Sequence, residues 1–165
     1  MGVNGAGSNY AQAFFKGDFN AEGADFSRDG HYVAYLAEET SQLEIYIRPY
    51  RKPGGEVTVS VAGGREPVWA ANGEVFYRSL TGERMFAVSV TTEPTLKVGK
   101  PLELFHGTYF VSPTGSPRPQ YDVTADGQRF LMLVPAPGTS GSVPRPRMIV
   151  VQNWTEELKR LVPTR

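Results

Sequence analysis

The sequence predicts an all-β protein made of short antiparallel strands. Glycine and proline contribute 18 and 13 of the 165 residues, and aromatic residues 12%, a composition typical of many turns between short strands. At three places, apolar strands flank an Asp-Gly or Asn-Gly pair. Such pairs favour tight hairpins, because the turn requires a positive φ that glycine adopts without steric cost.

These three hairpins form an internal repeat. Their turn glycines are Gly30, Gly73 and Gly127, spaced by 43 and 54 residues. A strand-rich repeat of about 40 to 45 residues is typical of one blade of a β-propeller. The longer interval contains the loop from Gly107 to Pro119, with three prolines and two glycines.

Further strands are predicted after each hairpin, where apolar residues alternate or run together. They cover Leu43–Arg48, Val57–Val61, Met85–Val90, Leu102–Phe105 and Met148–Val151. We therefore predict a β-propeller fragment of about three four-stranded antiparallel blades, the last of them one strand short. The predicted blades span about residues 22–62, 65–106 and 118–153.

The two ends of the chain complete the predicted organisation. Residues 1–9 are interpreted as a flexible lead-in, and residues 10–165 as half a β-propeller. A strand at residues 12–19 is predicted ahead of the first blade. A short C-terminal helix at residues 154–162 is predicted because Asn153 can cap it and Glu156 follows three residues later.

Composition excludes several classes of function. The chain has no cysteine, and its 17 basic residues balance its 17 acidic ones, so thiol chemistry and nucleic-acid binding are not expected. No apolar run is long enough to span a bilayer, so no membrane insertion is expected. No signal peptide is recognisable at the N-terminus, and the sequence does not determine the compartment.

No catalytic, metal or cofactor site is predicted. The only histidines are His31 and His106, and no nucleophile motif accompanies them. The side chains of Asp29, Asn72 and Asp126 lack the spacing of a calcium loop and are interpreted as turn residues. Trp69 is interpreted as core packing between blades.

Polar residues just ahead of the first strand of each repeat are the candidate ligand-binding site. In a propeller these strands line the central channel, so the residues would lie near one mouth, where ligands of propellers often bind. Ordinary solvated charge is the alternative interpretation. The candidates are Glu22, Arg65, Glu66, Arg118 and Gln120.

The hairpin segments resemble the TolB-type propeller family, whose repeat reads roughly Phe-Ser-Pro-Asp-Gly. Phe26 to Gly30 follows this pattern except at Arg28, where proline is usual. A closer resemblance is to the C-terminal propellers of bacterial proteins, often fused behind a serine/threonine kinase domain. It is carried by Ile47–Tyr50, Gly63–Trp69, Tyr121–Leu131 and Asn153–Arg160.

The resemblance covers about residues 14–162 and implies that this chain is the C-terminal half of a six-bladed ring. It implies that Val162 and Pro163 lie near the natural end of the parent. It also implies a sensor or protein-interaction role, and a periplasmic or exterior location for a TolB-like parent. No kinase motif is present in the chain itself.

These observations predict a non-catalytic module for protein interaction or ligand sensing. A half-ring has open faces and edges, which favour association, so we expect a homodimer that completes a six-bladed ring. The segment at residues 12–19 would lie beside Met148–Val151 of the partner, as a strand swap. Closure within one chain and aggregation are the structural alternatives. The functional alternative is a hydrolase or lyase acting on a sugar or peptide at the channel mouth.

Overall fold

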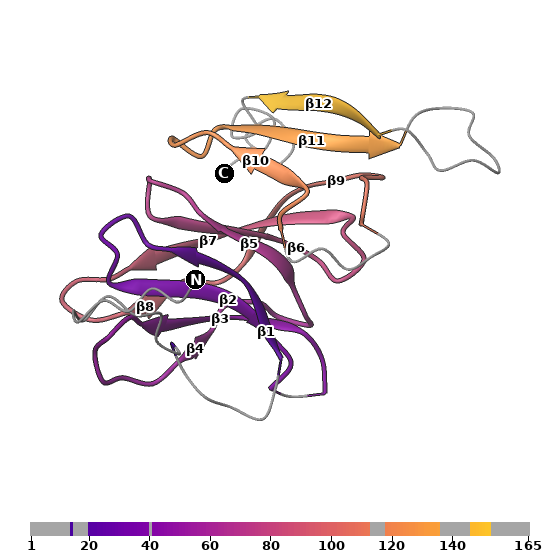
Figure 1. The fold of residues 1–165 in the computed structure, drawn as a ribbon. Coiled ribbons are helices and arrows are strands. Elements are labelled where there is room, and N and C mark those ends of the chain that lie inside the picture. Colours follow the sequence, from indigo (N-terminus) through magenta and orange to yellow (C-terminus); the bar gives the residue numbers. More distant parts are fainter. Residues whose placement is uncertain (1–13, 15–19, 40, 113–117, 136–145, 153–165) are drawn as a thin grey trace, which may run out of the picture.

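The computed structural model describes residues 14, 20–39, 41–112, 118–135 and 146–152. Over these ranges the chain is all-β, with twelve strands in three antiparallel sheets (Figure 1), which confirms the predicted class. The helix predicted at residues 154–162 lies outside the described residues, as does the strand predicted at 12–19 except for Phe14. Within the described ranges, no helix is long and apolar enough to cross a membrane.

Each sheet begins with one of the predicted hairpins and continues in chain order. The first sheet has the order β1-β2-β3-β4, and the third has the order β10-β11-β12. In the second, β5 to β8 follow in order and β9 also pairs with β7. The strands of the first sheet are β1 (Ala21–Phe26), β2 (Tyr32–Ala37), β3 (Glu44–Pro49) and β4 (Val57–Thr58). Those of the second are β5 (Arg65–Trp69), β6 (Glu74–Arg78), β7 (Arg84–Thr91), β8 (Lys97–Val98) and β9 (Leu102–His106). Those of the third are β10 (Tyr121–Val123), β11 (Arg129–Pro135) and β12 (Pro146–Gln152).

The strand predicted at Val57–Val61 is wrong at its second half, because β4 ends at Thr58. The Ser60 hydroxyl accepts a hydrogen bond of 2.8 Å from the Ile45 N–H and donates to the Glu44 carboxylate. Val61 is 71% exposed, and Ala62 has a φ of 60°. The Val59 N–H still donates to the Ile45 carbonyl at 2.7 Å. After Val59 the chain turns away from the sheet, and the Ser60 hydroxyl takes the place of a backbone partner.

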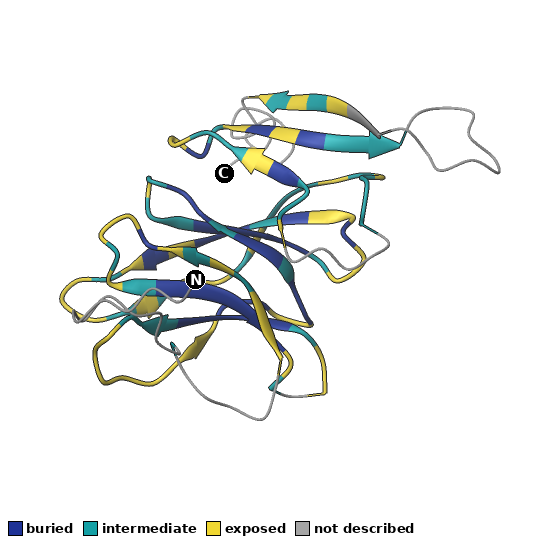
Figure 2. Ribbon diagram, viewed as in Figure 1, coloured by how far each residue is buried: buried dark blue, intermediate teal, exposed yellow. Residues whose placement is uncertain are grey.

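The sheets are stacked (Figure 1), and many strand residues that face a neighbouring sheet are buried (Figure 2). Two apolar clusters fill the layers between the sheets. The middle sheet contributes to both layers, because alternate residues of β6 point to opposite sides. Val75 and Tyr77 face the first sheet, and Phe76 faces the third, where its ring meets Phe130 edge-on at 5.1 Å between centroids. Trp69 is 8% exposed in the layer between the first two sheets, so its predicted role in core packing is confirmed.

The hairpin turns have the predicted geometry. Gly30, Gly73 and Gly127 have φ values of 70°, 90° and 73°. Asp29 and Asp126 act as turn residues, since each carboxylate accepts the backbone N–H two residues later, at 2.9 and 3.0 Å. The same side chains bond a preceding hydroxyl, from Ser27 in the first turn and Thr124 in the third.

Removing the first of these hydroxyls tests the turn. The Ser27 hydroxyl donates to Asp29 at 2.6 Å and, with the His31 N–H, lowers the pKa of the Asp29 carboxyl. We expect Ser27→Ala to raise that pKa towards its ordinary value in an NMR titration. A carboxyl with a lowered pKa stabilises the fold above its unfolded pKa and loses this effect as the pH falls through the folded pKa. The natural protein and Ser27→Ala should therefore differ in their free energy of unfolding at neutral pH. The part of this difference that comes from the Asp29 pKa should disappear in acid.

The matched control is the third hairpin. Hydrogen bonding from Thr124 and the Gln128 N–H lowers the pKa of Asp126, so this pKa should stay unchanged in Ser27→Ala and rise in Thr124→Ala. If the pKa of Asp29 does not change in Ser27→Ala, the Ser27 hydroxyl is not what lowers it.

Candidate functional site

The first strands of the first two sheets each contain a bulge, and the bulges shape the candidate site. The pairing of β1 with β2 shifts in register between Glu22 and Asp25, and the pairing of β5 with β6 shifts between Arg65 and Val68. The bulge residues, Gly23 and Glu66, have φ values of 62° and 60°. Glycine adopts this conformation freely, whereas a non-glycine residue is strained there by about 1–3 kcal/mol. The backbone at Glu66 therefore needs other interactions to hold it.

The Glu66 carboxylate lies between two arginines. Arg78 Nη1 is 3.0 Å from Glu66 Oε2, and Arg65 Nε is 3.2 Å from Glu66 Oε1. The side chains of Glu66 and Arg78 are 2% and 1% exposed, and that of Arg65 is 19% exposed. A buried charge is tolerated only with partners of this kind, so this ion cluster is a constraint on the fold.

Arg78 also holds two loops together. Its Nε donates to the carbonyl of Gly82 at 2.9 Å, in the turn between β6 and β7. Its Nη1 donates to the carbonyl of Phe110 at 3.1 Å, in the segment after β9. The guanidinium also lies 5.8 Å from the centre of the Tyr109 ring. One buried side chain thus fixes a bulge, a turn and a connecting segment.

The same cluster reaches the third sheet through Glu66. The Gln120 N–H donates to Glu66 Oε2 at 3.2 Å, and the Tyr121 hydroxyl donates to the Glu66 carbonyl at 2.9 Å. Burial, with the nearby Glu66 charge, raises the pKa of Tyr121 well above its ordinary value, so the hydroxyl keeps its proton and remains a donor.

A different carboxylate joins the first and second sheets. Asp25 Oδ2 accepts the Trp69 N–H at 2.8 Å, while Asp25 Oδ1 accepts the Phe26 N–H at 3.0 Å. A pocket of about 400 Å³ lies beside this contact. It is lined by Gly23, Ala24, Asp25, Pro67, Arg118 and Pro119.

Three of the five predicted site residues are in direct contact. Arg65, Glu66 and Gln120 belong to the ion cluster. Arg118 is exposed, lines the pocket beside Asp25, and its carbonyl accepts a bond from Gln120 Nε2 at 3.1 Å. Glu22 is exposed on β1 and is not among the lining residues.

Sequence reasoning missed Arg78 and Asp25. A signal existed for Arg78, because it is a charged residue at the end of an apolar strand. The equivalent positions in the other repeats, counted from the turn glycine, are Tyr35 and Met132. Asp25 has an equivalent in Asp122 of the third repeat, which also could have been noticed.

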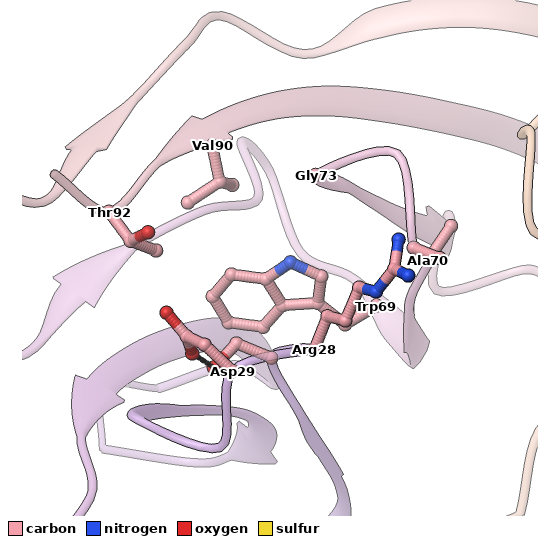
Figure 3. Close-up of a pocket in the computed structure, with 9 residues that line it drawn as sticks. Arg28, Asp29, Trp69, Ala70, Gly73, Val90 and Thr92 are labelled. Atoms are coloured by element: carbon pink, nitrogen blue, oxygen red, sulfur yellow. Dashed lines mark hydrogen bonds between the residues drawn. The ribbon is translucent and has the colours of Figure 1, made fainter.

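A second pocket, also about 400 Å³, lies at the turn end of the first two sheets. Figure 3 shows the Trp69 ring between Arg28 and Asp29 on one side and Val90 and Thr92 on the other. The Asp29 carboxylate is already bonded within its own turn. This pocket therefore has the character of a packing gap beside a tryptophan.

The ion cluster has a structural role. Both oxygens of Glu66 face guanidinium groups and the carboxylate is almost fully buried, so a substrate could not reach it. In the described part of the chain, no three His, Asp or Glu side chains are grouped to hold a metal ion. The exposed chemistry near the cluster is the guanidinium of Arg118 and the pocket beside it.

Comparison with known proteins adds no family to this description. No protein-family model matches the chain, and no curated protein matches it.

Truncating Arg78 tests the ion cluster. We expect Arg78→Met to lower the free energy of unfolding by about 3–5 kcal/mol, because it leaves the Glu66 carboxylate buried with one partner fewer. Urea denaturation measures this loss. Glu66→Gln should cost less in the Arg78→Met background than in the natural protein, because the two changes share one interaction.

The matched control is Arg65→Met, which removes the more exposed arginine of the same cluster and should cost less than Arg78→Met. Equal losses for the two arginines, or additive effects of Arg78→Met and Glu66→Gln, would contradict the central role of Arg78.

Proposed function

We propose that the chain is a non-catalytic interaction module of the TolB-like propeller type, and that two copies associate to complete a six-bladed ring. The stacking of three antiparallel sheets, each starting with the same hairpin, supports this proposal. Each sheet would be one blade or part of one.

The observation that carries the proposal is the outer face of the third sheet. Leu131, Met148 and Val150 are 38%, 69% and 55% exposed on this face. Together with Asp122 and Arg129, two of these side chains line a pocket of about 370 Å³. Neighbouring apolar side chains exposed on a regular sheet mark an interaction surface.

The proposed partner would meet the outer side of the first sheet, where a small apolar cluster is already buried. Tyr35 and Tyr46 are 2% and 5% exposed and stack there at 5.8 Å, and the Tyr35 hydroxyl donates to Glu56 at 2.6 Å. Phe14 packs against Tyr50 of the same face at 5.5 Å. In the proposed strand swap, the segment that contains Phe14 passes to the partner, so the swap has to compete with this contact.

Ligand sensing would use the pocket beside Asp25. Its exposed guanidinium, Arg118, could bind an anionic group, and Asp25 already links two sheets there. The hydrolase or lyase alternative would need a reactive carboxylate at the same place. Both oxygens of Asp25 already accept backbone N–H groups, and Glu66 is 2% exposed and paired with arginines. We therefore favour the binding module.

Light scattering on the purified protein tests the proposed association. The chain has a mass of 18.1 kDa, so we expect a species of about twice that mass. Deletion of residues 1–19 should weaken the dimer if the swapped strand contributes to it. A well-behaved monomer would contradict the half-ring proposal. A dimer that is unchanged by the deletion would support the ring but contradict the strand swap.

A hydrolase screen separates the module from the enzyme. Arg118→Ala is the informative variant because its side chain is exposed, whereas a Glu66 variant could lose activity by unfolding. Turnover that disappears in Arg118→Ala at unchanged stability would favour the enzyme.

A further inference from the structure

The first and third hairpins are alike down to individual hydrogen bonds. Asp25 and Asp122 both lie five residues before the turn glycine and face Ala34 and Leu131 across the hairpin. Each carboxylate accepts the next residue's N–H through Oδ1, at 3.0 Å for Asp25 and 2.8 Å for Asp122.

The two aspartates differ at their second oxygen. Asp25 Oδ2 accepts the Trp69 N–H from the first strand of the next sheet, at 2.8 Å. Asp122 is exposed, and its Oδ2 receives no hydrogen bond from any residue in the described ranges. The third sheet therefore presents the same acceptor, and no other described sheet uses it.

The hairpin itself does not need this aspartate. The second hairpin has Val68 at the equivalent position and forms the same turn, with Gly73 at a φ of 90°. The junction that follows it uses Glu66 instead, which bonds Gln120 and Tyr121 of the third sheet. An aspartate at this position is therefore not required for the turn, and its role is to bond the next sheet.

The first sheet presents the other half of such a junction. Trp69 and Val123, both four residues before a turn glycine, pack into the layer shared with the preceding sheet. Phe26 occupies this position in the first sheet and is 51% exposed, with its ring against Tyr50 at 5.0 Å. Within the described ranges, the third sheet thus presents an acceptor oxygen without a hydrogen bond, and the first sheet presents a half-exposed ring.

We propose that a second copy of this chain joins these halves. Asp122 of one copy accepts a backbone N–H from the edge of β1 of the partner subunit, the edge that pairs with no other described strand, and Phe26 of the partner subunit packs against Leu131. This proposal rests on the proposed homodimer. We call this contact, between Asp122 and Leu131 of one copy and Phe26 of the other, the seam. Two-fold symmetry forms the seam twice in the dimer.

The seam is not identical to the internal junction. The N–H equivalent to that of Trp69 is the N–H of Phe26, which already donates to Asp25 Oδ1. Asp25 and Asp122 would share this donor, and two carboxylates near one donor repel each other. The seam is therefore weaker than the Asp25–Trp69 contact and easier to separate.

The test compares dimer dissociation constants by sedimentation. We expect Asp122→Ala to raise Kd about tenfold, because the symmetric dimer loses a weak, shared hydrogen bond at each of two seams. Asp122→Asn retains an acceptor oxygen without the repulsion from Asp25 and should bind at least as tightly as the natural protein. Phe26→Ala should also raise Kd with little change in monomer stability, since the ring is half exposed. Asp126→Ala, in the same hairpin as Asp122 but at the turn, is the matched control.

The possible results separate the two proposals. A monomeric natural protein would overturn both the dimer and the seam. A dimer whose Kd ignores Asp122→Ala and Phe26→Ala would overturn only the seam. If Asp122→Ala fails to fold, Phe26→Ala and Asp122→Asn decide: the seam requires a loss in the first and at least the natural affinity in the second.

Discussion

The guanidinium of Arg78 is the constraint on which the middle of this structure depends. It neutralises the buried Glu66 carboxylate and bonds the carbonyls of Gly82 and Phe110. The strained backbone of Glu66 is tolerated because the same residue is held from both sides of the bulge. Gly82 is constrained as well: its φ is 76°, and an added Cβ would lie 2.7 Å from Arg78 Nη2.

The same repeat thus forms two different sets of contacts between neighbouring sheets. Between the first and second sheets, Asp25 accepts a backbone N–H and Trp69 fills the apolar layer. Between the second and third, the carboxylate comes from Glu66, two residues earlier in the repeat, and a tyrosine hydroxyl bonds its carbonyl. The bulge in the first strand makes this change feasible, because it turns a residue that would otherwise alternate into the space between sheets.

The sequence predicted the turns well, because Asp-Gly and Asn-Gly require a backbone conformation that few other residues adopt. It predicted strands where apolar residues alternate, but not β8, whose Lys97 and Val98 pair with β7 over two residues only. It missed the end of β4, where the Ile45 N–H donates to the Ser60 hydroxyl and not to a backbone carbonyl. Within the candidate site, proximity to a first strand indicated Glu66 and Gln120 correctly as neighbours, while Arg78 comes from another strand and is brought there by register alone.

Among the described residues, the middle sheet packs against a sheet on each face, whereas the third sheet packs against a sheet on one. Opening the third sheet exposes a single apolar layer, but opening the second exposes two layers and separates Arg78 from Glu66. Local unfolding follows the amount of buried contact, so the chain has a built-in order of opening. We therefore expect the last sheet, whose outer side chains are exposed, to open before the first two. Amide hydrogens of β12 would then exchange with solvent through a smaller fluctuation than those of β6 and β7.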